Sequence, residues 1–186
     1  MLFRSKILYW GTSQWSAAEI MDAHRVAQQY HLIGPAMEQP QYNLFERFKM
    51  EQDYLPVFRN VGLGTTIWSP LASGFLTGKY LDKSPEGARL GMAGFEWLKD
   101  RWLQQDKIEK LKKLAAIAER MGVSMAAMSI AWPLRNPNVT TAILGATSRE
   151  QLHQNFKALE VLPLLTDDIM NEIDQIMQNK PVLDLA

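Results

Sequence analysis

The chain has 186 residues, which is enough to bury one substantial core, so a single domain over residues 1–186 is expected. Its 20 basic and 20 acidic side chains cancel, which favours neither nucleic acid nor an anionic membrane as a partner. The sequence has no cysteine, which excludes disulfides and thiolate metal sites and favours a cytoplasmic location. No apolar run approaches the roughly 20 residues of a membrane helix, so we expect no membrane insertion.

The chain opens with an apolar run and a helical pattern. Residues 7–10 are expected to form the first strand. Ser16 and Glu19 have the spacing of a capping box, which predicts a helix from there to about Tyr30. One face of this helix carries the apolar residues Ile20, Ala23, Val26, Ala27 and Tyr30, and we expect that face to be buried.

A second and a third strand are expected at residues 35–39 and 64–68, with a helix over residues 54–60 between them. Pro56 suits the first turn of this helix, because its missing N–H would have no helical partner there. Gly62 suits the position after the helix end, where the backbone turns left-handed.

Residues 81–105 are rich in Pro and Gly, and we expect them to form a long loop with at most short helices, of the kind found over active sites. Helices, a fourth strand and further helices follow at residues 106–121, 124–135, 140–144, 148–159 and 166–178. Strands that alternate with helices predict an α/β fold with a parallel sheet. Four such units are either a small doubly wound sheet or about half of a (β/α)8 barrel, which takes about 250 residues.

Three of the apolar runs lead directly into loops of small and hydroxylated residues, at residues 11–13, 68–80 and 145–148. Gly allows close approach of a ligand, Ser and Thr donate hydrogen bonds, and Lys79 adds positive charge, so the second of these loops suits a phosphate group. Parallel strands end at a common edge, and a single ligand site is therefore expected there.

These loops carry four motifs, in order along the chain, that resemble the aldo-keto reductase family. The motifs are Tyr9-Trp10-Gly11-Thr12-Ser13, Glu38-Gln39-Pro40-Gln41-Tyr42-Asn43, Trp68-Ser69-Pro70-Leu71-Ala72-Ser73-Gly74 and Leu144-Gly145-Ala146-Thr147-Ser148 with Gln151 and Asn155. Within that family they are most similar to the beta subunits of voltage-gated potassium channels and their bacterial reductase relatives. The resemblance runs from about Lys6 to Pro181.

The resemblance implies a (β/α)8 TIM barrel that binds NADP(H), represented here by its carboxyl-terminal half. It also implies an NADPH-dependent reductase of aldehydes and ketones. The family's catalytic Asp, Tyr, Lys and His belong to the other half, so no catalytic residue is expected in this chain. Residues 1–5 do not resemble the family and are expected to be a non-native leader.

By the same resemblance, Trp68 would stack on the nicotinamide ring and Gln39 would bind its carboxamide. The residues that would contact the pyrophosphate and the adjoining part of the cofactor are Ser13, Gln14, Ser69, Pro70, Leu71, Ala72, Ser73, Lys79 and Arg89. Gln14 stands where the channel subunits have Arg. Taken alone, Trp68 would more often be a core residue at a strand end, and isolated charges such as Lys79 and Arg89 would more often be solvated surface residues.

The adenosine end of the cofactor would lie at a helix start, where free N–H groups attract an anion. The residues implied there are Gly145, Thr147, Arg149, Gln151, Gln154 and Asn155. Thr147 and Arg149 are the candidates for the 2′-phosphate, and Gln154 stands where the family usually has Glu. Ser148 would equally be only a helix cap.

Two other readings stay open beside a reductase. One is a regulatory subunit of a potassium channel that uses the nucleotide as a sensor, and the other is a truncated product without function. The expected partners are a small carbonyl substrate and a second copy of the chain, with a channel subunit as a further partner if the chain is a regulatory subunit. His24, His31 and His153 lack metal-ligand spacing, and no metal is expected.

Overall fold

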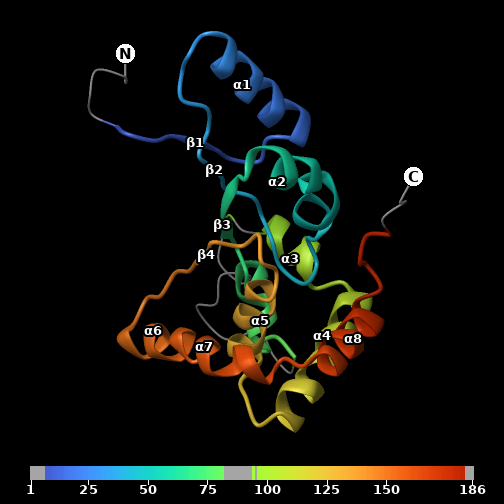
Figure 1. Ribbon diagram of the computed structural model, residues 1–186. Helices are drawn as coiled ribbons and strands as arrows, with labels where there is room; N and C mark the ends of the chain where they lie inside the picture. Colours follow the sequence, from blue (N-terminus) through green and yellow to red (C-terminus); the bar gives the residue numbers. More distant parts are fainter. Residues whose placement is uncertain (1–6, 82–93, 95, 183–186) are drawn as a thin grey trace.

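The computed structural model describes residues 7–81, 94 and 96–182. Within those residues the sheet has four parallel strands, β1 (Gly11–Thr12), β2 (Met37–Glu38), β3 (Gly64–Trp68) and β4 (Thr141–Ile143). They lie side by side in the order β1-β2-β3-β4 (Figure 1). Met37 pairs with Gly11 on one side and with Gly64 on the other, so β2 is an interior strand.

This order distinguishes the two architectures that the alternating pattern allows. A doubly wound sheet reverses its strand order at a switch point, whereas the strands of a (β/α) barrel follow one another in chain order. The four strands show no reversal. The α/β class is therefore confirmed, and the arrangement is that of successive units of a barrel.

Two helices and a π-helical turn connect the first three strands. The first helix, α1 (Ala17–Gln29), begins at the predicted capping box, in which the Ser16 N–H donates to Glu19 Oε2 at 2.7 Å. The second, α2 (Leu55–Val61), ends at Gly62, whose φ of 64° is the left-handed conformation that favours glycine. The π-helical turn η1 (Lys49–Asp53) precedes α2 and has no evident sequence signal.

The rest of the described chain is mostly helical. The 3₁₀ segment η2 (Ala72–Thr77) follows β3, and η4 (Leu162–Leu164) precedes the last helix. The α-helices are α3 (Glu96–Trp102), α4 (Gln105–Arg120), α5 (Met125–Leu134), α6 (Arg149–Phe156), α7 (Ala158–Val161) and α8 (Asp167–Met177). Side-chain oxygens of Ser124, Ser148 and Thr166 accept a backbone N–H three residues ahead and cap α5, α6 and α8.

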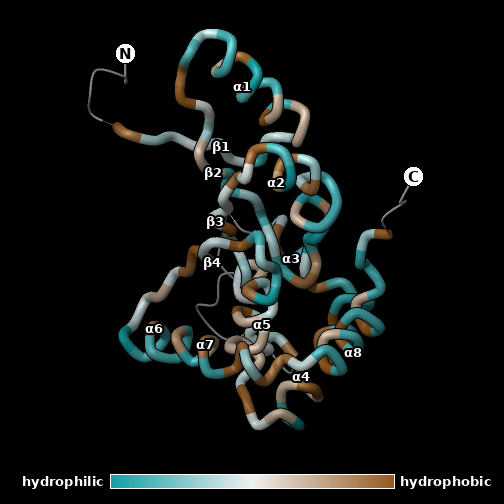
Figure 2. The backbone as a smooth tube through the Cα atoms, viewed as in Figure 1, coloured by the Kyte–Doolittle hydropathy of each residue, from teal (hydrophilic) through white to brown (hydrophobic). Residues whose placement is uncertain are grey.

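An aromatic part of the core lies between η2, α3 and the segment after β2. Trp102 stacks on Phe75 with 5.7 Å between ring centroids, and Phe45 meets Trp102 edge-on at 5.5 Å. The sequence of α5 is apolar on almost every face, and Figure 2 shows neutral to hydrophobic colours along it and hydrophilic stretches on α1 and α6. The apolar helix α5 packs against η2, α4, α6 and α7.

The prediction of a strand at residues 7–10 is wrong. The strand lies at Gly11–Thr12, and Ile7, Leu8 and Tyr9 are exposed. The first sheet-like contact is the bond from the Ala36 N–H to the Trp10 carbonyl at 2.8 Å. The apolar run at residues 7–10 predicted the strand too early in the chain, because pairing with the segment of β2 begins only at Trp10.

Two further predictions need correction. The apolar stripe of α1 is buried at Ile20 and Ala27 but exposed at Val26 and Tyr30, because α1 packs on α2 along one side only. The expected helix over residues 148–159 is divided into α6 and α7.

The predicted long loop at residues 81–105 contains the short helix α3, as the prediction allowed, and its Trp102 is buried. Residues 82–93 and 95 lie outside the described residues, as does the leader expected at residues 1–5. Among the helices that the structure describes, none is long and apolar enough by itself to cross a membrane. Only α4 and α5 taken together reach that length and hydropathy, across a bend of 94°.

Candidate functional site

The loop after β3 turns tightly at the carboxyl end of the sheet. Ser69, Ala72 and Ser73 have φ values of 55°, 49° and 58°, and Gly74 continues the turn at 90°. The left-handed region is unfavourable for residues with a Cβ, and such strain clusters at functional sites. Of the six non-glycine residues with positive φ in the described chain, three lie in this loop and a fourth is Gln14. Four of the six are therefore predicted site residues.

Hydrogen bonds within the loop hold this conformation. The Ala72 N–H donates to the Ser69 carbonyl at 3.0 Å, and the Ser73 N–H donates to Ser69 Oγ at 3.2 Å. The Gly74 N–H donates to the Leu71 carbonyl at 2.9 Å. These three amides are already engaged, so the Ser69 and Ser73 hydroxyls are better placed than the amides to donate to a ligand.

Lys79 supplies a positive charge beside this loop. A Cβ placed on Gly74 would lie 3.4 Å from Lys79 Nζ, so the ammonium group is next to the turn. Lys79 is exposed, and its Nζ also lies 5.1 Å from the centre of the Tyr80 ring. Arg89, the second predicted cation, lies outside the described residues. Pro70 and Ala72 are buried and serve to shape the loop.

Trp68 is the last residue of β3, and hydrogen bonds to its backbone and to its indole Nε1 hold it in place. Its backbone N–H donates to the Pro40 carbonyl at 3.0 Å, and its carbonyl accepts from the Tyr42 N–H at 3.3 Å. With the Gln14 amide turned to satisfy both donors, its oxygen accepts from Trp68 Nε1 at 3.0 Å and from the Gln41 N–H at 2.7 Å. Trp68 is half-buried, and Gln14 satisfies the polar edge of its indole ring.

Gln39 and Ser13 lie next to each other at the ends of β2 and β1. Ser13 Oγ donates to the Gln39 backbone carbonyl at 2.9 Å, and the Gln39 N–H donates to the Thr12 carbonyl at 2.8 Å. The structure therefore brings the predicted residues of the first three strands together at one edge, as the parallel topology requires.

The predicted adenosine segment is separate from this cluster. Figure 1 shows α6 and α7 away from the sheet, after an extended stretch that leaves β4. The described residues show no hydrogen bond or ion pair between the loop after β3 and the start of α6. Gly145, Thr147 and Arg149 are exposed, and so are Gln151 and Gln154, while Asn155 is half-buried.

The start of α6 is nevertheless ordered by its own side chains. Ser148 Oγ accepts from the Gln151 N–H at 3.2 Å, as the capping pattern predicted. Gln151 Oε1 in turn accepts from the Thr147 N–H at 2.9 Å and from the Thr147 hydroxyl at 3.1 Å. Thr147 and Gln151 thus satisfy each other. Arg149 makes no hydrogen bond or ion pair to any described residue and remains available to an anion.

Two residues that support the site, Asn43 and Lys49, are not among those predicted for it. Asn43 is fully buried, and its Nδ2 donates to the Ser69 carbonyl at 2.9 Å. Its Oδ1 accepts from the Phe45 N–H at 2.9 Å, which is an Asx turn that a Tyr-Asn sequence after a strand signals weakly. Lys49 Nζ donates to the carbonyls of Gln14 and Trp15, each at 2.7 Å, and nothing local in the sequence indicates this.

Beneath the site, Glu38 is a buried carboxylate at the end of β2. It accepts hydrogen bonds from the Thr12 hydroxyl and, at 3.4 Å, from Tyr54. Burial and the charge of Glu38 raise the pKa of the Tyr54 hydroxyl well above its ordinary value, so this tyrosine stays protonated. These bonds connect the ends of β1 and β2 with the residue that caps α2.

Comparison with known proteins agrees with this architecture. A family model described as aldo/keto reductase family matches residues 4–178. The chain is 47% identical over 174 residues to a probable voltage-gated potassium channel subunit beta of Oryza sativa subsp. japonica. It is 45% identical over 174 residues to a protein of the same description from Arabidopsis thaliana.

Both alignments cover 93% of this chain and 53% of the relative, so the chain spans about half the length of the curated relatives it matches. Half of an eight-stranded barrel is four strands, which is the number that the described residues form. The chain therefore belongs to the aldo/keto reductase family, and its fold is about half of that family's (β/α)8 barrel.

Proposed function

We propose that this chain is the NADP(H)-binding half of a carbonyl reductase. The observation that carries the proposal is the strained loop at residues 69–74, which lies between Trp68 and Lys79 at the carboxyl edge of the sheet. Strain of about 1–3 kcal/mol per residue persists only where the surroundings impose it, and binding sites are where it gathers.

The residues at this edge fit the nicotinamide and pyrophosphate end of the cofactor. Trp68 would offer a ring face for stacking, with Gln14 holding its Nε1, and Gln39 would donate to the carboxamide. The hydroxyls of Ser13, Ser69 and Ser73 and the ammonium of Lys79 would neutralise the pyrophosphate. Leu71 would pack beside the cofactor, and we retain Arg89 as a second cation.

The adenosine end of the cofactor would lie along the segment after β4. Ile143 of β4 pairs with Trp68, and residues 144–148 lead from there to the start of α6. At that helix start, Arg149 and Thr147 would bind the 2′-phosphate, Gln151, Gln154 and Asn155 the adenine, and Gly145 would allow close approach.

Bound NADPH would supply a hydride to the carbonyl carbon of an aldehyde or ketone. This chain's residues would hold and orient the nicotinamide so that one ring face is open toward the substrate. We propose that protonation of the carbonyl oxygen requires a donor from the other half of the barrel, because a reduction of this kind needs a positioned acid. The isolated chain would then bind nucleotide without turnover.

A fluorescence titration with NADPH tests the proposal. Trp68→Phe should weaken binding about tenfold, because the smaller ring loses stacking area. The matched control is Trp97→Phe in α3, since Trp97 is exposed and lies outside the site, and its binding should equal that of the wild type. Equal affinity in both variants, or no binding by a folded wild-type chain, would overturn the proposal.

A second function has support from the relatives. Both are described as probable channel subunits, which favours a regulatory protein that uses the nucleotide as a sensor. Turnover of an aldehyde by a full-length parent protein would favour the reductase, whereas copurification with a channel would favour the regulatory subunit. If the chain is a truncated product without function, we expect neither of these results, and we expect no nucleotide binding.

We also propose that the chain assembles as a homo-oligomer. The edge strands β1 and β4 each pair on one side only within the described sheet, and such edges invite a further strand. Ile143 and Leu144 are exposed at β4, and Ile7 and Tyr9 are exposed before β1. Covering a few hundred Å² of apolar surface at about 25 cal/mol per Å² contributes on the order of 10 kcal/mol. A single domain and a cytoplasmic location remain predictions from composition.

A further inference from the structure

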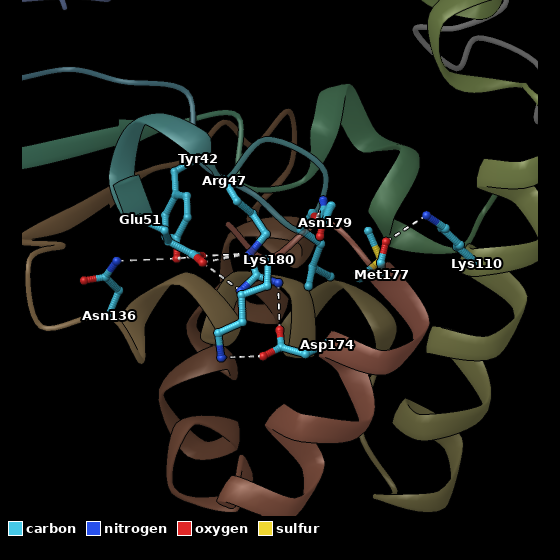
Figure 3. Close-up of polar contacts among 10 residues, drawn as sticks. Tyr42, Arg47, Glu51, Lys110, Asn136, Asp174, Met177, Asn179 and Lys180 are labelled. Atoms are coloured by element: carbon cyan, nitrogen blue, oxygen red, sulfur yellow. Dashed lines mark hydrogen bonds and ion pairs between the residues drawn. The ribbon is translucent and has the colours of Figure 1, made fainter. Parts of the chain in front are cut away.

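A buried ion-pair cluster joins the last helix of the chain to the segment that follows β2. Arg47 donates to Asp174 of α8 at 2.7 Å and to Glu51 of η1 at 2.8 Å. The Tyr42 hydroxyl donates to Glu51 at 2.7 Å, and Lys180 donates to the second oxygen of Asp174 at 2.8 Å. Figure 3 shows these side chains converging between the η1 segment and α8. We call these five residues the α8 clamp.

The clamp is built as a specific structure and is not a chance surface contact. Only 3% of the Arg47 side chain is exposed, and its guanidinium lies 5.0 Å from the centre of the Trp132 ring. Burial alone would lower the pKa of Arg47, but its hydrogen bonds to Glu51 and Asp174 raise that pKa above the ordinary value. A buried guanidinium needs such partners, and removing one leaves an uncompensated charge.

The clamp connects to the site through two adjacent residues. Tyr42 belongs to the clamp, where its hydroxyl donates a hydrogen bond to Glu51. Its backbone N–H donates a second hydrogen bond to the Trp68 carbonyl, at 3.3 Å. Asn43, next in the chain, donates to the Ser69 carbonyl at 2.9 Å. The carbonyls of Trp68 and Ser69 are therefore held by a segment whose other side is anchored on α8.

The end of α8 adds a second anchor on the same segment. Asn179 Nδ2 donates to the Leu44 carbonyl at 2.9 Å, directly beyond the left-handed Gln178 that ends the helix. The residues that contact the carbonyls of Trp68 and Ser69 thus lie within residues 42–47. This stretch is bound at Leu44 by Asn179 and at Arg47 by Asp174 of α8. The two partners of the central ion pair are 127 residues apart in the sequence.

We propose that Asp174 and Arg47 are positioning residues for the nucleotide loop: docking of α8 through their ion pair sets the placement of Trp68 and Ser69. The inference rests on the proposed nucleotide site but concerns a part of the chain that does not touch the ligand. α8 then acts as a strap, and a change that loosens it changes the affinity of the loop without altering any contact residue.

The test combines a structural readout with a binding readout. The chain is labelled with 5-fluorotryptophan, and the fluorine resonance of Trp68 is assigned by its loss in Trp68→Phe. Asp174→Asn keeps the size of the side chain and removes its charge. The matched control is Glu172→Gln, also on α8, which breaks an exposed ion pair with Arg120 and leaves the clamp intact. Circular dichroism establishes that each variant is folded.

Asp174→Asn should shift or broaden the Trp68 resonance without nucleotide and weaken NADPH binding about threefold to tenfold, whereas Glu172→Gln changes neither. An unchanged Trp68 resonance in folded Asp174→Asn would overturn the inference. If Asp174→Asn does not fold, Lys180→Met, which removes only the outer partner of Asp174, takes its place and should give a smaller shift of the same resonance. A shifted resonance in a chain that does not bind NADPH would support the clamp and reject the proposed function.

Discussion

The side-chain amide of Asn43 donates a hydrogen bond to the backbone carbonyl of Ser69, at 2.9 Å, from a fully buried position. Ser69 is the first left-handed residue of the loop after Trp68, so its peptide orientation is set from outside the loop. The strain in that loop is thus balanced partly by a residue of the preceding βα connection.

Asn43→Asp tests this relationship because it keeps the shape of the side chain and removes the donor. The Ser69 carbonyl keeps its bond from the Ala72 N–H, but the Asn43 bond is lost and a negative charge is placed at a buried position beside that carbonyl. Together these changes should lower the free energy of unfolding by about 1–3 kcal/mol. Asn60→Asp at the exposed end of α2 is the control and should change stability little. Chemical denaturation measures both, and equal stability of the two variants would show that the Asn43 bond is unimportant.

Arg149 and Thr147 should separate the two nicotinamide cofactors. Replacing both with Ala removes the charged and hydroxyl donors proposed for the 2′-phosphate, which only NADPH carries. Affinity for NADPH should fall about tenfold or more, because hydrogen bonds to charged groups contribute about 1.5–3 kcal/mol, while affinity for NADH should stay nearly constant. Equal losses for both nucleotides in a fluorescence titration would reject this assignment.

The isolated chain should not reduce a carbonyl. A reactive aromatic aldehyde and NADPH are incubated with purified chain, and absorbance of the reduced cofactor is followed. No turnover above background is expected, because we propose that the acid which protonates the oxygen comes from the other half of the barrel. Turnover that disappears in Trp68→Ala, with a host reductase excluded, would contradict the proposal.

Asp174 should give the protein part of its resistance to acid. Burial raises the pKa of this carboxyl, but hydrogen bonds from Lys180 and Arg47 outweigh burial and hold the pKa below its ordinary value of 3.8. A lowered folded-state pKa contributes stability that is present above 3.8 and is lost as pH falls through the folded-state value.

Asp174→Asn should therefore lower the free energy of unfolding by about 1–3 kcal/mol at neutral pH, a figure discounted for the partial exposure of the carboxylate. The difference from the wild type should vanish at low pH. Urea titrations at several pH values measure it. A difference that stays the same down to pH about 2 would mean that the charge of Asp174 is not the cause.

Cross-linking at the edge strands tests assembly. The chain has no cysteine, so only the introduced thiols can form disulfides. Tyr9→Cys combined with Leu144→Cys places thiols near opposite sheet edges. Two strands lie between these edges at about 4.8 Å spacing, so a disulfide within one chain is out of reach. Oxidation should give a covalent dimer, whereas Tyr9→Cys with Lys112→Cys on the exposed face of α4 should not.

Sedimentation of the wild-type chain complements the cross-link. A dimer at micromolar concentration is the expected species, with two copies pairing their edges. A cooperatively melting monomer, together with no cross-link in the first double variant, would show that the sheet edges are covered in another way.

Local chemistry made much of this fold predictable. Ser16, Ser124, Ser148 and Thr166 each cap the helix that was expected after them, because capping depends on only three or four neighbouring residues. Alternation of strands and helices likewise predicted the parallel sheet. The position of β1 was missed because an apolar run does not indicate where pairing with β2 begins.

The site was predictable only where it follows strand ends. Trp68, Gln39 and Ser13 meet because parallel strands share an edge. The contact of Arg47 with Asp174 and that of Lys49 with Gln14 join residues far apart in the sequence, and no local pattern indicates them. The separation of α6 from the sheet was not expected either, because a helix cap fixes the start of a helix and not its docking.

The proposed site is tested most directly by mapping amide chemical shifts of the isotope-labelled chain during a titration with NADPH. We expect the largest chemical-shift changes at Ser13, Gln39 and residues 68–74. A second group of changes is expected at residues 147–155, and these changes should become smaller when NADH replaces NADPH. Saturable changes confined to other surfaces, or none at these strand ends in a folded chain, would contradict the assignment of this edge as a nucleotide site.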